Sequence, residues 1–202
     1  MRWLISSETA ARLCSIDEFV AALRRLPASA FDVTPGPVQQ FLREHPVAPD
    51  SLQPYLCWDR QHYTRNLIDK TELYELIAIC WEVGQQSSIH NHHNQNCWMA
   101  APIGRLVVQN YRANFEDITT GKCNIAPTYT VEITPLNPAV VDPAEPIHKV
   151  VNPLENNERA VTLHVYSRPF DRCVVYSKEQ GTCGEIELRN TTEYGRQVDR
   201  QA

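Results

Sequence analysis

The chain has 202 residues, 43% of them hydrophobic and 21% charged, so it is long enough to bury an ordinary globular core. Its 24 acidic residues outnumber the 19 basic ones and give a net charge of -5, and it has no Lys/Arg-rich run, which argues against a nucleic-acid partner. The first five residues give way to Ser6-Ser7-Glu8 too soon for a signal peptide, and the longest apolar stretch, residues 73–83, is interrupted by Glu75 and Glu82. We therefore expect no signal peptide, no membrane span and a cytoplasmic location.

The first fifty residues are predicted to form a helical layer. Ser15 and Glu18 have the spacing of a capping box, which marks the start of a helix. The apolar residues that follow share one helical face: Ile16, Phe19, Leu23 and Leu26. A Pro-Gly-Pro sequence at 35–37 ends this part, and a second short helix is predicted to run to about His45, with Val38, Phe41 and Leu42 on one side.

From residue 63 onward the pattern changes to short strands separated by Gly, Pro, Asn or charged turns. The predicted strands are 63–68, 74–81, 89–93, 106–111, 129–133, 147–151, 160–167, 173–176 and 185–188. Regular spacing of this kind is typical of an all-β sandwich or barrel. We predict one domain over residues 1–202, with a helical extension at about 1–50 packed on a β-barrel core at about 60–195.

Seven cysteines lie far apart in the sequence, and no two form a Cys-x-x-Cys pair. An odd number at these spacings fits neither a disulfide framework nor a zinc ribbon. Most are therefore expected to be buried thiols in a reducing compartment. They are Cys14, Cys57, Cys80, Cys97, Cys123, Cys173 and Cys183.

Two histidines, His90 and His92, are the first candidate metal ligands. Residues two apart on a strand point to the same face, so both imidazoles are expected to project together, while His93 points away to the surface or to a supporting position. Two histidines on the solvated face of a strand also occur without a metal. A third histidine, His148, lies in a similar strand setting, and three nitrogen ligands suit iron, zinc or nickel.

The spacing of these residues resembles the two cupin motifs. Gly84, His90-x-His92, Cys97 and Gly104 are similar to the first motif, and His148-x-x-x-Asn152 to the second. Most cupins have Glu where this chain has Cys97, and cysteine at that place resembles the cysteine dioxygenases. The segments Tyr63-Thr64-Arg65-Asn66-Leu67 and Leu163-His164-Val165-Tyr166-Ser167 agree, and the likeness extends from about residue 63 to 195. It implies a cupin barrel, the double-stranded β-helix or jelly-roll, with N-terminal helices.

By this resemblance, His90, His92 and His148 would hold Fe(II), and the protein would oxidise the thiol of L-cysteine with O2 to cysteine sulfinic acid. Three neutral imidazoles leave the charge of the ferrous ion uncompensated, which favours an anionic ligand and deprotonates a bound thiol. Arg65, which shares a strand face with Tyr63, would bind the substrate carboxylate, because a guanidinium matches that group. A lone arginine here could also be an ordinary solvated residue.

The same resemblance assigns a hydrogen-bond relay to the strand at 160–167. Strand alternation places Thr162, His164 and Tyr166 on one face, which would either be solvated or turn inward. In cysteine dioxygenases this face turns inward, with His164 orienting Tyr166 near the substrate. The resemblance also makes Cys97 and Tyr166 the partners of a thioether crosslink.

Two departures from the family pattern affect these expectations. Thr162 stands where the family usually has Ser, which keeps the hydroxyl. Ser167-Arg168-Pro169 replaces the Ser-Pro-Pro that is familiar in the family, so Arg168 takes the place of the first proline. We therefore expect a changed turn that shifts Tyr166 or brings Arg168 near the pocket. Cys173 coincides with a cysteine near the entrance in cysteine dioxygenases and favours cysteine as the substrate.

Three alternative functions follow from the same residues. One is a dioxygenase for 3-mercaptopropionate or another small thiol, although related mercaptopropionate enzymes typically carry Gln at the place of Arg65. Another is a metal-binding cupin without catalysis, which would not need Arg65 or Tyr166. The last is a structural domain whose histidines bind no metal. The expected partners are a small thiol and O2, and the expected state is a monomer.

Overall fold

The computed structural model describes residues 12–198, so the ends of the predicted single domain, residues 1–11 and 199–202, lie outside the described part. The helical elements are α1 (Ile16–Leu23), η1 (Ala28–Phe31), α2 (Pro37–Glu44), η2 (Pro49–Tyr55) and η3 (Leu154–Asn156). The predicted capping box is confirmed, because the Ser15 side chain accepts from the Glu18 N–H and the Glu18 side chain accepts from the Ser15 N–H. Helix α1 is shorter than expected and ends before Leu26.

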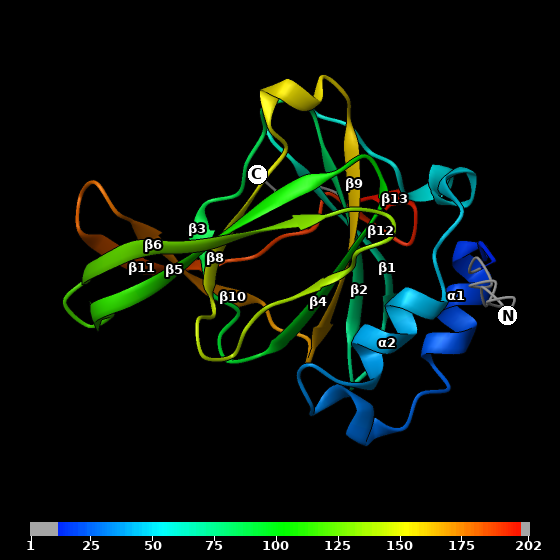
Figure 1. Cartoon of the computed structure of the whole chain (residues 1–202), viewed down its shortest axis with the longest axis horizontal. Helices are drawn as coiled ribbons and strands as arrows, with labels where there is room; N and C mark the ends of the chain where they lie inside the picture. The colour runs from blue at the N-terminus through cyan, green and yellow to red at the C-terminus, as the bar shows by residue number, and fades with distance from the viewer. Residues whose placement is uncertain (1–11, 199–202) are drawn as a thin grey trace, which may run out of the picture.

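The strands form two sheets (Figure 1). The first has the order β13-β12-β1-β2-β9-β4-β7, and the second has the order β10-β11-β6-β5-β8-β3 and closes into a barrel. The bounds are β1 (Thr64–Lys70), β2 (Glu75–Trp81), β3 (Ile89–His90), β4 (Asn96–Ile103), β5 (Leu106–Asp117), β6 (Lys122–Ile133), β7 (Ala139–Val140), β8 (Ile147–Val151), β9 (Ala160–Ser167), β10 (Arg172–Ser177), β11 (Thr182–Glu187), β12 (Thr192–Glu193) and β13 (Arg196–Gln197). An all-β cupin barrel with N-terminal helices is thus confirmed.

The predicted strands differ from the observed ones in informative ways. Those at 147–151 and 160–167 have the predicted bounds, whereas β4, β7, β12 and β13 were not predicted. The strand predicted at 89–93 ends at His90. Strands β5 and β6 are twelve residues each, much longer than expected, because they pair with each other as a long hairpin beyond the barrel.

Strand β2 divides the core into two parts, because both of its faces are buried. Leu76, Ala78 and Cys80 pack toward the helical layer together with residues of α1 and α2. Ile77, Ile79 and Trp81 point into the barrel. Figure 1 shows the two helices beside β1 and β2, away from the long β5–β6 hairpin.

The two cupin motifs are joined at one end of the barrel by Asn152. Its backbone N–H donates to the Gln85 carbonyl over 2.9 Å, and its carbonyl accepts from the Gly84 N–H at 2.9 Å. Its buried side chain donates to the carbonyls of Trp81, Glu82 and Glu158. Asn152 therefore fixes the start of the first motif against the end of the second. No helix in residues 12–198 is both long and apolar enough to span a bilayer.

Candidate functional site

Three histidines converge inside one end of the barrel. One ring nitrogen from each of His90, His92 and His148 lies within 4.8 Å of those of the other two. His90 on β3 is the direct cross-strand partner of His148 on β8. The ring centroids of these two lie 4.7 Å apart, and that of His92 lies 4.8 Å from His148 and 5.2 Å from His90. The predicted ligands are therefore brought together.

The expectation that His90 and His92 share one strand face is wrong in its geometry. Strand β3 ends at His90, and the following residues form a turn in which His93 and Asn94 both have positive φ. His92 returns to the site through this turn and not by strand alternation. His93 is exposed, as predicted for a surface residue.

The donor atoms of the three rings are prepared for a cation. Nδ1 of His90 lies 2.9 Å from the Ser88 carbonyl, and Nδ1 of His148 lies 3.3 Å from the Pro146 carbonyl. A carbonyl only accepts, so each Nδ1 carries the proton and each Nε2 is left with a free lone pair. Both ring nitrogens of His92 are buried without a partner among the described residues, and a metal ion would satisfy one of them.

Burial keeps the three rings neutral. It lowers the pKa of His90 to about 4, and it lowers the pKa of His92 and His148 well below the usual value, with the neighbouring histidines adding to the effect. A neutral imidazole is the form that binds a metal ion. The residues present thus fit a cation held by three nitrogen ligands.

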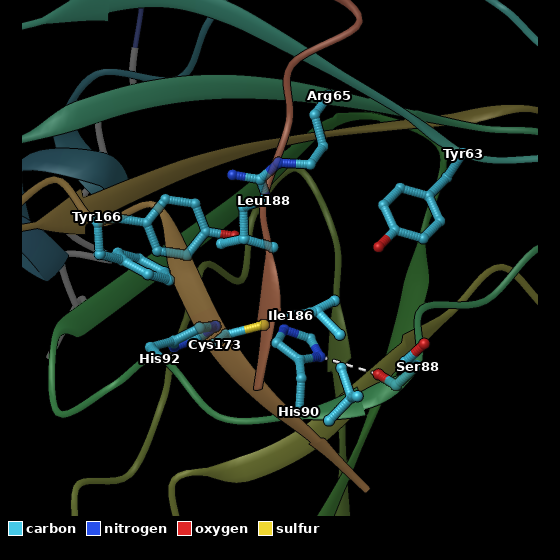
Figure 2. Close-up of a pocket in the computed structure, with 11 residues that line it drawn as sticks. Tyr63, Arg65, Ser88, His90, His92, Tyr166, Cys173, Ile186 and Leu188 are labelled. Atoms are coloured by element: carbon cyan, nitrogen blue, oxygen red, sulfur yellow. Dashed lines mark hydrogen bonds between the residues drawn. The ribbon is translucent and has the colours of Figure 1, made fainter. Parts of the chain in front are cut away.

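A small pocket opens beside the histidines, and Figure 2 shows Arg65 and Tyr63 across it from His90 and His92. The guanidinium carbon of Arg65 lies 5.7 Å from the centroid of the Tyr166 ring. The Nε atom of Arg65 is buried without a hydrogen-bond partner in the part of the chain described here. A buried guanidinium with spare donors can accept a carboxylate. The lining consists of Tyr63, Arg65, Ser88, His90, His92, Tyr166, Phe170, Cys173, Val175, Ile186 and Leu188.

The polar face of β9 turns inward, where a chain of hydrogen bonds ends at Tyr166. All eight residues of β9 are buried. Nε1 of Trp81 donates to Oγ1 of Thr162 over 2.9 Å, and this hydroxyl lies 2.8 Å from Nε2 of His164. Nδ1 of His164 lies 3.0 Å from the Tyr166 hydroxyl. Trp81 is the one member of this series of hydrogen bonds to which the sequence analysis gave no role.

The indole determines the direction of this chain, because it can only donate. Among residues 12–198 the Thr162 hydroxyl has no other acceptor than His164, so its proton is directed to Nε2. Burial lowers the pKa of His164 well below its usual value, so the ring is neutral and its one proton lies on Nδ1. Nδ1–H then donates to the Tyr166 oxygen, which leaves the phenolic proton free to point into the pocket. Burial, with Cys97 nearby, raises the pKa of Tyr166, so the phenol keeps that proton.

Cys97 lies on β4 directly opposite Tyr166 of β9. Its side chain is fully buried, and its Sγ lies 3.9 Å from Nδ1 of His164. Burial raises the pKa of Cys97 well above the usual value for a thiol. The structure therefore brings the two predicted crosslink partners to neighbouring positions.

The expectation for Arg168 is wrong. Its side chain is exposed and does not line the pocket, while Tyr166 keeps its inward position. The Ser167–Arg168 peptide is cis. The pocket residues that the sequence did not reveal, chiefly Ile186 and Leu188, come from β11 and the residue after it, which meet the histidines only through folding.

A double-stranded β-helix with three inward histidines at one end defines a cupin with a three-histidine group suited to a metal ion. The family model described as "Cysteine dioxygenase type I" matches residues 5–179, and the chain belongs to this family. The chain is 27% identical to the human protein "Cysteine dioxygenase type 1" over 160 residues, 78% of this chain and 77% of that one. The rat protein of the same name is 28% identical over 160 residues, with the same shares. The zebrafish one is 26% identical over 159 residues, again with the same shares.

Proposed function

We propose that this protein uses Fe(II) and O2 to oxidise the thiol of L-cysteine to cysteine sulfinic acid. Family membership supports a dioxygenase that acts on thiols. The observation that carries the finer proposal is the pairing of three neutral histidines with Arg65 across one small pocket. The histidines would hold the metal ion, and the guanidinium would bind the carboxylate of an amino-acid thiol. Iron, when bound there, would supply the redox chemistry that couples O2 to the thiol.

The residues of the chain have separate tasks in this reaction. His90, His92 and His148 bind Fe(II) without adding negative charge, which promotes loss of the substrate thiol proton. Arg65 binds the carboxylate of the substrate and so sets the position of the substrate, and Tyr63 forms another wall of the pocket.

The chain of hydrogen bonds behind the site has a task of its own. Trp81, Thr162 and His164 direct the proton of Tyr166 into the pocket. There the phenol can donate to the substrate carboxylate or to the oxygen that adds to sulfur.

We further propose that Cys97 and Tyr166 become joined by a thioether. Their cross-strand position supports this. A bond between Sγ and a ring carbon would replace one S–H and one C–H bond, and O2 would take the two electrons and two protons. Mass spectrometry of a tryptic digest tests the proposal. A linked peptide pair lighter by two hydrogen atoms is expected, and two unlinked peptides after repeated turnover would refute it.

The cysteines also suggest the cellular compartment in which the protein works. All seven cysteines are free thiols, which supports the cytoplasm as a reducing location. The partners proposed are a small thiol and O2, acting on a monomer.

The activity is tested by loading the protein anaerobically with one equivalent of Fe(II) and measuring O2 uptake and sulfinate formation. L-Cysteine, 3-mercaptopropionate and cysteamine are compared in parallel. Uptake that matches cysteine sulfinate, and that is fastest with L-cysteine, is expected. A preference for 3-mercaptopropionate would overturn the substrate, and metal binding without uptake for any thiol would overturn the reaction.

A further inference from the structure

Asn91 lies between the two histidines of the first motif and forms the centre of a hydrogen-bond cluster. Its backbone N–H donates to the Val174 carbonyl over 3.1 Å. Its Oδ1 accepts from the Val174 N–H at 3.1 Å and from the His93 N–H at 3.2 Å. Its Nδ2 donates to the Tyr176 hydroxyl over 3.0 Å. Strand β10, which carries Val174 and Tyr176, thereby holds the turn between His90 and His92.

The Tyr176 hydroxyl has two partners, and their chemistry determines the direction of each bond. It donates its one proton to Oε1 of Glu116 over 2.7 Å. Its oxygen is then free to accept from the Asn91 amide, which fixes the amide with the nitrogen toward Tyr176 and the oxygen toward the two backbone N–H groups. Tyr176 is 6% exposed and packs with Ile147 and Val174, so its ring is fixed by the core.

We propose that Tyr176 is a positioning residue for the metal centre, because its hydroxyl holds Asn91 and so fixes where His92 presents its imidazole. This inference depends on the proposed metal-binding function of the three histidines. The hydroxyl contacts neither the metal ligands nor the pocket lining, and it acts only through Asn91.

The short β3 strand explains why the turn needs such an anchor. The ladder of β3 with β10 consists of two residue pairs, His90 with Val175 and Ile89 with Tyr176. After His90 no strand pairing continues, and the next turn holds two residues with positive φ. Both His92 ring nitrogens lack a partner among the described residues, so no hydrogen bond of its own orients this ring. The ring packs against those of Tyr166 and Phe170, and the His92 carbonyl accepts from the Gln95 N–H at 2.9 Å. Asn91 adds the hydrogen bonds that tie this turn to strand β10.

The test compares Tyr176→Phe with Tyr74→Phe. Tyr74 is a matched control, because its buried hydroxyl also donates to a carboxylate, Oδ2 of Asp69 at 2.6 Å. Tyr74 packs in the core cluster with α1 and α2 and lies outside the pocket lining. Each protein is titrated with Co(II), which is stable in air, and then anaerobically with Fe(II). The dissociation constants and the visible absorption bands of bound Co(II) are measured.

We expect Tyr176→Phe to weaken metal binding about tenfold, the lower end of the range for groups that orient metal ligands, and to shift the Co(II) bands. Tyr74→Phe should leave both unchanged, even where it lowers thermal stability. Asn91→Ala removes all three side-chain bonds and should weaken binding at least as much, so it carries the test if Tyr176→Phe does not fold.

Two results would overturn the inference. One is a dissociation constant for Tyr176→Phe, or for Asn91→Ala in its place, within twofold of the unmodified protein with unchanged bands. The other is an equal loss in Tyr74→Phe, which would show general destabilisation. Because the readout is metal binding, an unmodified protein that binds metal but consumes no O2 would refute the proposed reaction and leave this inference standing.

Discussion

Replacing Arg65 with Ala tests how the pocket selects its substrate. The guanidinium lies over the Tyr166 ring, and no carboxylate lies within ion-pair distance of it in the part of the chain that the structure describes. The buried Glu75 carboxylate acts on this charge without forming an ion pair, so the guanidinium donors are left to bind a substrate carboxylate. Truncating one partner of a buried, hydrogen-bonded charge pair costs 2–5 kcal/mol, and we take about 3 kcal/mol.

A loss of about 3 kcal/mol in transition-state binding corresponds to about a 150-fold fall in kcat/KM. We expect this fall for L-cysteine and a change within about threefold for cysteamine, because cysteamine has no carboxylate. The assay is O2 uptake by the Fe(II)-loaded protein over a range of each thiol. Arg172→Ala is the matched control, since Arg172 is an exposed residue paired with Glu185 at 2.9 Å and outside the pocket lining. Equal losses with both thiols, or an equal loss in the control, would refute the carboxylate role of Arg65.

Three further predictions concern the histidines and the relay. His148→Ala should abolish Fe(II) binding, measured by metal analysis after gel filtration, and a full equivalent of retained iron would contradict the ligand assignment. Thr162→Val, which breaks the link from Trp81 to His164, should lower kcat about tenfold with little change in KM, while Thr162→Ser should retain activity; equal rates for both variants would exclude the relay. The metal-free protein should lose stability as pH falls from about 6.5 towards 4, by about 1.4 kcal/mol per pH unit for each buried histidine of the site. Burial lowers the pKa of these histidines in the folded state, so the unfolded chain binds more protons than the folded one in this range. Chemical denaturation at several pH values measures this, and a free energy of unfolding that is flat over that range would contradict it.

Local patterns in the sequence were sufficient for much of the fold. The capping box at Ser15 and Glu18 acts within one helical turn, so the start of α1 could be predicted. The strands at 147–151 and 160–167 have clear β character, and both have the predicted bounds. Strand β4 was missed, although it carries Cys97, because its sequence alternates poorly and its pairing with β9 is a long-range contact.

In the candidate site, too, some features could be predicted from the sequence and others depended on the fold. The identities and spacing of His90, His92 and His148 indicated a metal site, because few other arrangements of residues place three nitrogen donors at such positions. The alternation argument for His92 was nevertheless wrong, since the strand ends one residue too early for it. Strand alternation predicts which side chains share a face only for residues inside the strand.

What the sequence by itself determined is the chemistry of this protein: which residue types are present, in which motif spacing, and therefore which family the chain resembles. Only the tertiary structure decided how the site is built. It directs the proton of Tyr166 through Trp81, it adds Leu188 from the end of the chain to the pocket, and it holds His92 through Asn91. These contacts join segments tens of residues apart, and no local periodicity specifies them, because they depend on how the two sheets close around one core.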